Sequence, residues 1–173
     1  MGLTKEERFT MKIMSIDAST KSTGVAIFED GKLIDYKNLT ESGADTLRRI
    51  KDMTKQIEDY YLSFKPNIVV MEDVLPSDVG NNQKTFKPLI YLQGEVVLAL
   101  HEHKQSVEFM NVNTWRSIIG IPVGRYAKRE LVKQKSIEFI KKKYGIDAND
   151  DICDGICIGY AYQNQTDDEP SAF

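Results

Sequence analysis

The chain has 173 residues, of which 41% are hydrophobic, and a formal net charge of −3 at neutral pH. This length accommodates one domain with its own core and is too short for two. Apolar runs such as 96–100 fall far short of the roughly 20 residues that cross a bilayer, which argues against a membrane protein. The charged N-terminus, with Lys5 to Arg8, does not have the pattern of a secretory signal, so we expect a cytoplasmic protein.

The first half of the chain predicts three strands, a helix and a fourth strand. Alternating apolar residues and an Asp-Gly turn predict antiparallel strands over 11–18, 24–28 and 33–36. From Gly43 to Pro66, apolar residues recur at helical spacing. The expected buried stripe of that helix is Leu47, Ile50, Met53, Ile57, Tyr60, Tyr61 and Phe64. The β-branched run 68–71 then predicts a buried strand that leads into Glu72.

The second half predicts helices around one further strand. A helix over 89–100 is expected to have Pro88 in or near its first turn. The remaining expected segments are a strand over 107–112, a short helix over 114–119, a loop over 120–124 and a helix over 128–144 closed by Gly145. The helical stripe of that segment is Leu131, Ile137, Phe139 and Ile140. A last helix begins near Asp150 or Asp151, because either residue suits an N-cap or a first turn.

This order predicts an α/β fold with a five-stranded mixed sheet, in which the first three strands are antiparallel and helices cover both faces. We expect one domain over 11–164, a flexible arm over 1–10 and a disordered acidic tail over 165–173. Cys153 and Cys157 are expected to be buried structural residues, because a zinc site usually needs four ligands.

Four carboxylates stand where buried elements begin or end: Asp17, Glu72, Asp151 and Asp154. Each alone has an ordinary explanation, as a strand-end, solvated or helix-capping residue. Brought together, they would raise one another's pKa unless a cation neutralised them. An all-carboxylate set suits Mg²⁺ or Mn²⁺, and two such ions, about 3.5–4 Å apart, can promote phosphodiester hydrolysis. Asp150 remains an alternative to Asp151, which we favour.

The segment 125–143 is strongly basic, with Lys or Arg at eight positions and Glu at two. Such a run is most often a solvated helix face. Beside an acidic site, however, it would offset the repulsion between carboxylates and DNA phosphates. The residues expected to contact DNA are Arg116, Arg125, Lys128, Arg129 and Lys133.

Three motifs together resemble the RuvC-type Holliday-junction resolvases of the ribonuclease H-like superfamily. They are Ile13–Ser19 with Thr23–Ala26, Val69–Val74, and Asp151–Gly159. The resemblance covers 11–163 and implies a ribonuclease H-like fold in a homodimeric endonuclease that cuts branched DNA, above all four-way junctions, with divalent metal. It implies metal-binding roles for the four carboxylates and a role at the cleavage site for Lys128.

The chain departs from the family pattern at two places. Ala18-Ser19-Thr20 replaces the usual glycine-rich turn, and Leu75 stands where an aromatic residue is often found. Phe86 and Tyr91 are candidate replacements for that aromatic residue.

Three alternatives stay open. The stretch 16–24 also resembles the phosphate loop of sugar kinases and actin-like ATPases, although those proteins need two such domains to enclose ATP. The shorter YqgF-type nucleases, associated with RNA processing, have the same fold and a similar acidic set. A non-catalytic protein that binds branched DNA is the third alternative. The small size would suit an enzyme encoded by a phage and acting in an infected host.

Overall fold

The computed structural model describes residues 10–76, 82–121 and 128–165. A five-stranded sheet has the order β3-β2-β1-β4-β5. Its strands are β1 (Lys12–Asp17), β2 (Ser22–Glu29), β3 (Lys32–Thr40), β4 (Ile68–Glu72) and β5 (Val107–Met110). The first three strands pair antiparallel, whereas β4 lies parallel to both β1 and β5. The predicted mixed sheet is confirmed.

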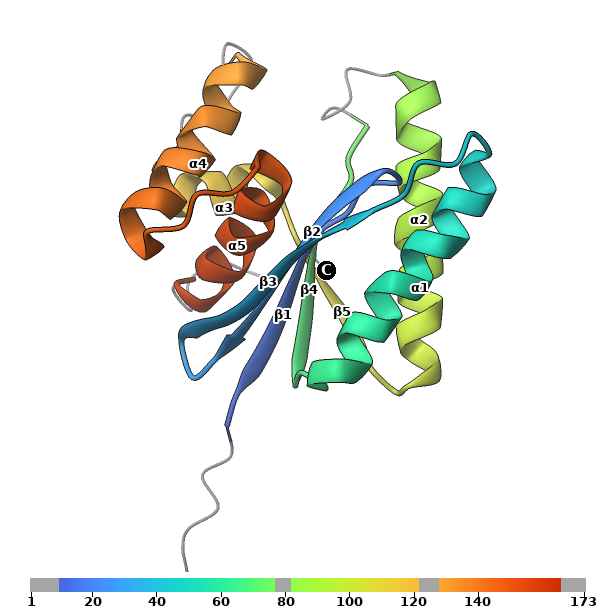
Figure 1. Ribbon diagram of the computed structural model, residues 1–173, viewed down its shortest axis with the longest axis horizontal. Helices are drawn as coiled ribbons and strands as arrows, with labels where there is room; N and C mark the ends of the chain where they lie inside the picture. Colours follow the sequence, from blue (N-terminus) through green and yellow to red (C-terminus); the bar gives the residue numbers. More distant parts are fainter. Residues whose placement is uncertain (1–9, 77–81, 122–127, 166–173) are drawn as a thin grey trace, which may run out of the picture.

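Helices cover both faces of this sheet, as predicted (Figure 1). They are α1 (Thr46–Phe64), α2 (Gln83–Glu102), α3 (Val112–Ile118), α4 (Arg129–Tyr144) and α5 (Asp150–Gln163). The helices α1 and α2 lie on one side, and α3, α4 and α5 lie on the other. None of the helices in the described ranges is long and apolar enough to span a bilayer.

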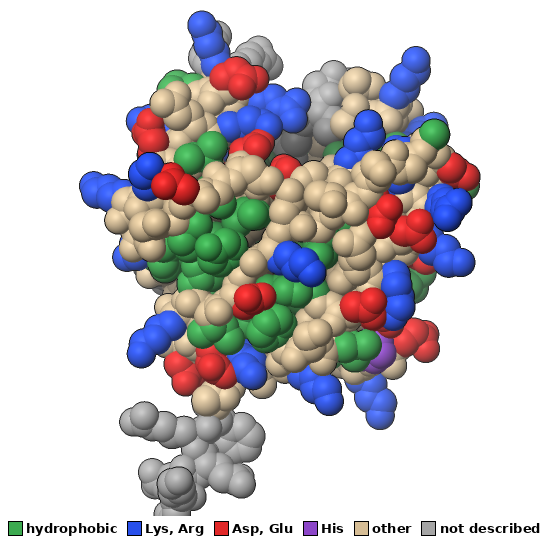
Figure 2. Space-filling view, in the orientation of Figure 1, with side chains coloured by type: hydrophobic (Ala, Val, Ile, Leu, Met, Phe, Trp, Pro, Cys, Tyr) green, Lys and Arg blue, Asp and Glu red, His purple; other side chains and the backbone are tan. Residues whose placement is uncertain are grey.

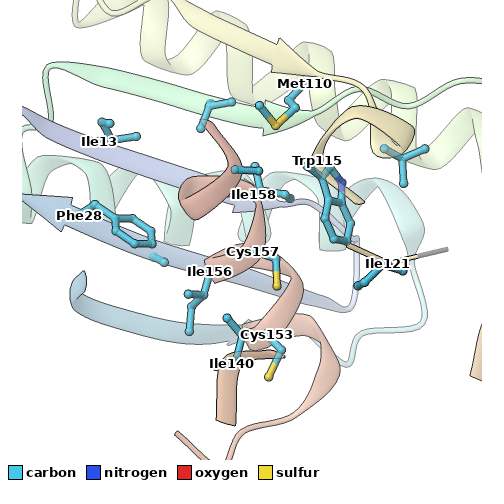
Figure 3. Close-up of a cluster of buried hydrophobic side chains, with 14 of the residues drawn as sticks. Ile13, Phe28, Met110, Trp115, Ile121, Ile140, Cys153, Ile156, Cys157 and Ile158 are labelled. Carbon is cyan, nitrogen blue, oxygen red and sulfur yellow. The ribbon is translucent and has the colours of Figure 1, made fainter. Parts of the chain in front are cut away.

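The sheet separates two apolar cores. Successive side chains of a strand point to opposite faces, so Ile13 packs toward α5, whereas Met14 and Ile16 pack toward α1 and α2. Figure 3 shows the core on the α5 side, where Cys153 and Cys157 lie among the apolar residues. Both cysteines are free and buried, which confirms the structural location predicted for them.

Local capping explains where most helices begin and end. Gly145 adopts a left-handed φ of 70° and closes α4, as predicted. Asn149 caps α5 through its side chain, so Asp150 and Asp151 fall in the first turn. Negative charge is favourable there because the helix dipole is positive at this end.

Several predicted boundaries differ from the structure; the strand expected over 33–36, for example, is β3 and extends to Thr40. Two of the differences have a clear local cause. The helix α2 begins at Gln83 rather than Leu89, because the Asn82 side chain accepts a hydrogen bond from the Lys84 amide and starts the helix earlier. Pro88 therefore lies inside the helix. Likewise β5 ends at Met110, because the Asn111 side chain caps α3.

Two predicted core positions are also wrong. Leu47, in the first turn of α1, is 67% exposed. It lines an open surface groove together with Pro88 and Tyr91 of α2. Leu131 is 45% exposed. The buried residues of α4 are instead Val132, Ser136 and Ile140, which lie four residues apart along one face of the helix.

One edge of the sheet is formed by β3. Ile34 and Tyr36 on this strand are 44% and 39% exposed. A β-bulge interrupts its pairing with β2 near Phe28. Apart from Thr10 and Gln165, the predicted arm over 1–10 and tail over 165–173 lie outside the described residues.

Candidate active site

Asp17 and Glu72 end two neighbouring parallel strands. Ile16 of β1 is paired with Met71 of β4, so the next residue of each strand is an acid at the same edge of the sheet. Burial raises the pKa of Asp17 well above its usual value, and the charge of Glu72 is the largest electrostatic contribution. The two carboxylates therefore share one site.

The helix α5 approaches this edge at backbone distance. A Cβ atom added to Gly24 would lie 1.7 Å from the carbonyl oxygen of Asp151, and one added to Gly155 would lie 2.8 Å from the Gly24 backbone. Gly24 is in turn the antiparallel partner of Asp17. The Ser15 hydroxyl donates to the Gly155 carbonyl over 2.7 Å. These contacts hold the first turn of α5 beside the end of β1.

The negative charges of all the other predicted acids raise the pKa of Asp17. The charges that raise its pKa, in decreasing order, are those of Glu72, Asp154, Asp151 and Asp150. Carboxylates from β1, β4 and α5 thus converge, although they are far apart in the sequence.

Glu72, Asp151 and Asp150 each have a polar contact with a neighbouring element. Glu72 accepts a hydrogen bond from the indole Nε1 of Trp115 over 2.7 Å. Asp151 accepts one from the Ser22 hydroxyl. Asp150 forms an ion pair with Lys133, which is the largest cause of its lowered pKa.

Asp154 is the most unusual of the four predicted ligands. Its Oδ1 is buried and has no hydrogen-bond partner among the described residues. Burial raises the pKa of Asp154 to about 6, although hydrogen bonding from Ser136 and the positive charge of Arg116 act in the opposite direction. A buried, unpartnered carboxylate oxygen is costly unless a cation or donor satisfies it.

The chemistry of this donor set fits a hard divalent cation such as Mg²⁺ or Mn²⁺. In the described ranges, no three Asp, Glu, His or Cys side chains stand where they could hold a metal ion as they are placed. Binding an ion therefore requires some of the carboxylate side chains to move closer together than they stand here.

The predicted basic residues fall into two groups. Arg116 acts on Asp154, while Arg129 and Lys133 act on Asp150. Figure 2 shows Lys and Arg side chains beside acidic ones on the upper part of the molecule. Among the described contacts, none brings Lys128 to the acids. It is exposed at the N-cap of α4. Arg125 lies outside the described residues.

Comparison of structures, rather than of sequences, reveals similarity to known proteins. No family model and no curated protein matches the sequence. RuvC of Thermus thermophilus, in complex with a Holliday junction substrate, superposes with a TM-score of 0.69 at 12% identity, over 88% of this chain and 93% of that chain. A second structure of Thermus thermophilus RuvC gives 0.67 at 14% identity over the same shares of the two chains.

The yeast mitochondrial Holliday junction resolvase Ydc2 gives a TM-score of 0.55 at 15% identity, over 88% of this chain and 77% of that chain. The chain has the ribonuclease H-like fold of RuvC. The fold implied by the three acidic motifs is thereby confirmed. In this RuvC-like fold, those motifs occupy the end of β1, the end of β4 and the first turns of α5.

Sequence reasoning missed three residues of the candidate site. They are Ser22, Trp115 and Ser136, which contact or act on Asp151, Glu72 and Asp154. Ser136 is a buried polar residue on the inner face of α4. A polar position within a helical apolar stripe was the one available signal, whereas the other two contacts depend on tertiary structure.

The variant Asp17→Asn is expected to be more stable than the wild type at neutral pH. The folded-state pKa of Asp17 is raised, so the wild type loses stability as the pH rises through and above the usual carboxyl pKa. The amide does not ionise, so this loss is absent from the variant. Urea unfolding should show a gain at pH 7 that shrinks toward about pH 4, near the usual Asp pKa.

The matched control is Asp147→Asn, because the side chain of Asp147 is 77% exposed and pairs with the surface residue Lys141. Its expected effect on unfolding is small at either pH. Equal stability of Asp17→Asn and wild type at both pH values would contradict the raised pKa of Asp17, which arises from burial and from repulsion by the neighbouring acids.

Proposed function

We propose that the chain is a metal-dependent endonuclease that hydrolyses phosphodiester bonds in branched DNA, above all in four-way junctions. The observation that carries this proposal is the convergence of carboxylates from β4 and α5 on the half-buried Asp17 at the end of β1. The junction substrate is supported by the RuvC fold, since the Thermus thermophilus RuvC in one matching structure is in complex with a Holliday junction.

Asp17, Glu72, Asp151 and Asp154 would hold Mg²⁺ or Mn²⁺, with two ions expected in a site of this kind. Such ions activate water and stabilise the leaving oxygen when bound. The pairing of β1 with β4 fixes the backbone positions of Asp17 and Glu72. The close contacts at the glycines fix the position of the first turn of α5. The fold thus brings the backbones of these acids together before DNA arrives.

Asp151, rather than Asp150, is the proposed ligand in the first turn of α5. Asp150 is paired with the ammonium group of Lys133, which neutralises its charge. Asp151 accepts from the neutral hydroxyl of Ser22 and so retains its charge for a cation. The two neighbouring aspartates thereby have different roles.

The basic residues beside the acids would contact the DNA backbone. Arg116, Arg129 and Lys133 lie near enough to affect the acids, so they can place a phosphate against the site. Lys128 lies beside Arg129 at the exposed start of α4, and its proposed role is at the cleavage site. Arg125 is a further candidate for DNA contact.

We also propose a homodimer in the cytoplasm of a bacterial cell or a phage-infected host. Paired cuts in a substrate with two-fold symmetry call for two related sites, which a two-fold dimer supplies. Light scattering after gel filtration should give twice the mass of the 19.7 kDa chain.

The deciding experiment is a cleavage assay on matched four-way, three-way and linear DNA with magnesium, manganese or chelator. The expected result is paired nicking of the four-way junction with either metal and none with chelator. Protein carrying Asp154→Asn, purified in parallel, controls for contaminating nucleases.

The same assay separates the alternatives. Cleavage of structured RNA but not DNA junctions would favour a YqgF-type activity. Junction binding that never leads to cleavage would favour a non-catalytic binding protein. Binding of ATP without metal-dependent cleavage would favour the kinase-like or actin-like alternative.

A further inference from the structure

The short helix α3 places the chain's single tryptophan against the acidic site. Trp115 is fully buried. Figure 3 shows its ring among Met110, Ile121 and Ile158. Its indole N–H is a donor that cannot accept, so burial requires an acceptor for it. That acceptor is Glu72 Oε2, at 2.7 Å.

This hydrogen bond fixes Glu72 without neutralising it. The indole ring is rigid and is held by the surrounding core, so its N–H is fixed in position. A lysine or arginine at the same place would cancel the negative charge that a cation needs. A neutral donor instead orients one carboxylate oxygen and leaves the charge in place.

The next residue of α3 acts on a second acid. The guanidinium of Arg116 lies 5.2 Å from the centroid of the Trp115 ring, and its charge acts on Asp154. Its Nε is buried and has no hydrogen-bond partner within the described part of the chain. Two consecutive residues of α3 therefore face acids from two different elements, β4 and α5.

We propose that Trp115 is a positioning residue for Glu72, holding this carboxylate for a divalent cation through the indole N–H. The inference rests on the nuclease function proposed above and assigns part of its metal site to α3. Trp115 acts through Glu72 and contacts neither DNA nor metal itself.

The first test uses the intrinsic fluorescence of the wild-type protein. The chain contains one tryptophan, so its emission reports on Trp115 alone. Titration with magnesium in the absence of DNA is expected to change the wavelength or intensity of this emission, because the ion binds the Glu72 carboxylate that accepts the hydrogen bond from the indole. Glu72→Gln should abolish the response. Glu138→Gln, which changes an exposed acid on α4, should retain it.

The second test uses Trp115→Phe, which keeps an aromatic ring and removes the donor. The magnesium concentration for half-maximal cleavage is expected to rise by about 10- to 100-fold, as is typical when the partner of a metal ligand is lost. Junction affinity measured in chelator should stay unchanged. If Trp115 had only a structural role, Trp115→Phe would lower the unfolding midpoint. The folded protein would then need the same magnesium concentration for half-maximal cleavage as the wild type.

The outcomes distinguish this inference from the proposed function. Wild-type cleavage without any emission response, or with unchanged magnesium dependence in Trp115→Phe, overturns the positioning role alone. If Trp115→Phe does not fold, the wild-type emission titration decides. An emission response that Glu72→Gln abolishes, in a protein that cuts no DNA, would support the positioning role and overturn the nuclease.

Discussion

Glu72→Gln and Asp154→Asn are each expected to abolish cleavage of a four-way junction while leaving junction binding intact or tighter. Both substitutions remove a charge that a divalent ion needs, and both reduce the repulsion of DNA phosphates. The loss of rate should exceed the roughly 10- to 100-fold that follows removal of a ligand's outer partner. Single-turnover cleavage with magnesium, and binding measured in chelator, check the two halves of this prediction.

The controls for these variants are acids outside the site. Asp147 and Glu138 are exposed, and each is paired with a surface lysine. Asp147→Asn and Glu138→Gln should therefore cleave at the wild-type rate. If Glu72→Gln or Asp154→Asn cleaved as fast as these controls, the acidic site would not be the site of hydrolysis.

Gly24→Ala is expected to destabilise the fold by about 3 kcal/mol or more, at or beyond the upper end of the usual cost of overpacking. The new methyl group would lie 1.7 Å from the Asp151 carbonyl oxygen. The atoms that this methyl group meets belong to the Asp151 backbone and cannot rotate away, so relief requires α5 to move away from β2. Urea unfolding monitored by circular dichroism measures the loss, and cleavage should fall with it because α5 carries two of the acids.

Gly94→Ala is the matched control on the same chain. Gly94 is exposed on α2, and nothing lies within 4 Å of a Cβ atom added there. The substitution should stabilise the protein by about 0.5–1 kcal/mol, because alanine is the better helix former. Comparable stability of Gly24→Ala and Gly94→Ala would mean that α5 does not pack against β2 at backbone distance.

Much of the fold could be predicted because local patterns determine it. A few neighbouring residues are enough to indicate the local structure at the Asp-Gly turn at 30–31, the apolar run 68–71 and the closing Gly145. The prediction of a helix boundary failed where a capping side chain started the helix ahead of a more conspicuous sequence signal. Pro88 suggested the start of a helix, but the Asn82 cap starts α2 before it.

The candidate site was predictable in part for a related reason. Asp17 and Glu72 each follow a buried strand, so their place at the sheet edge is evident from the sequence. The partners of the acids are not evident, because they come from other elements. Whether Lys133 pairs with Asp150 depends on how α4 packs beside α5, and no local pattern encodes that packing.

The exposed edge strand β3 bears on how the protein behaves at high concentration. An edge with free backbone groups and outward apolar side chains such as Ile34 and Tyr36 can template the addition of a strand from another molecule. Lys32 and Lys37 are exposed on this strand, and the bulge beside Phe28 distorts its pairing. Charge and irregularity of this kind discourage aggregation, and low ionic strength during purification should preserve the electrostatic repulsion between chains, because salt screens it.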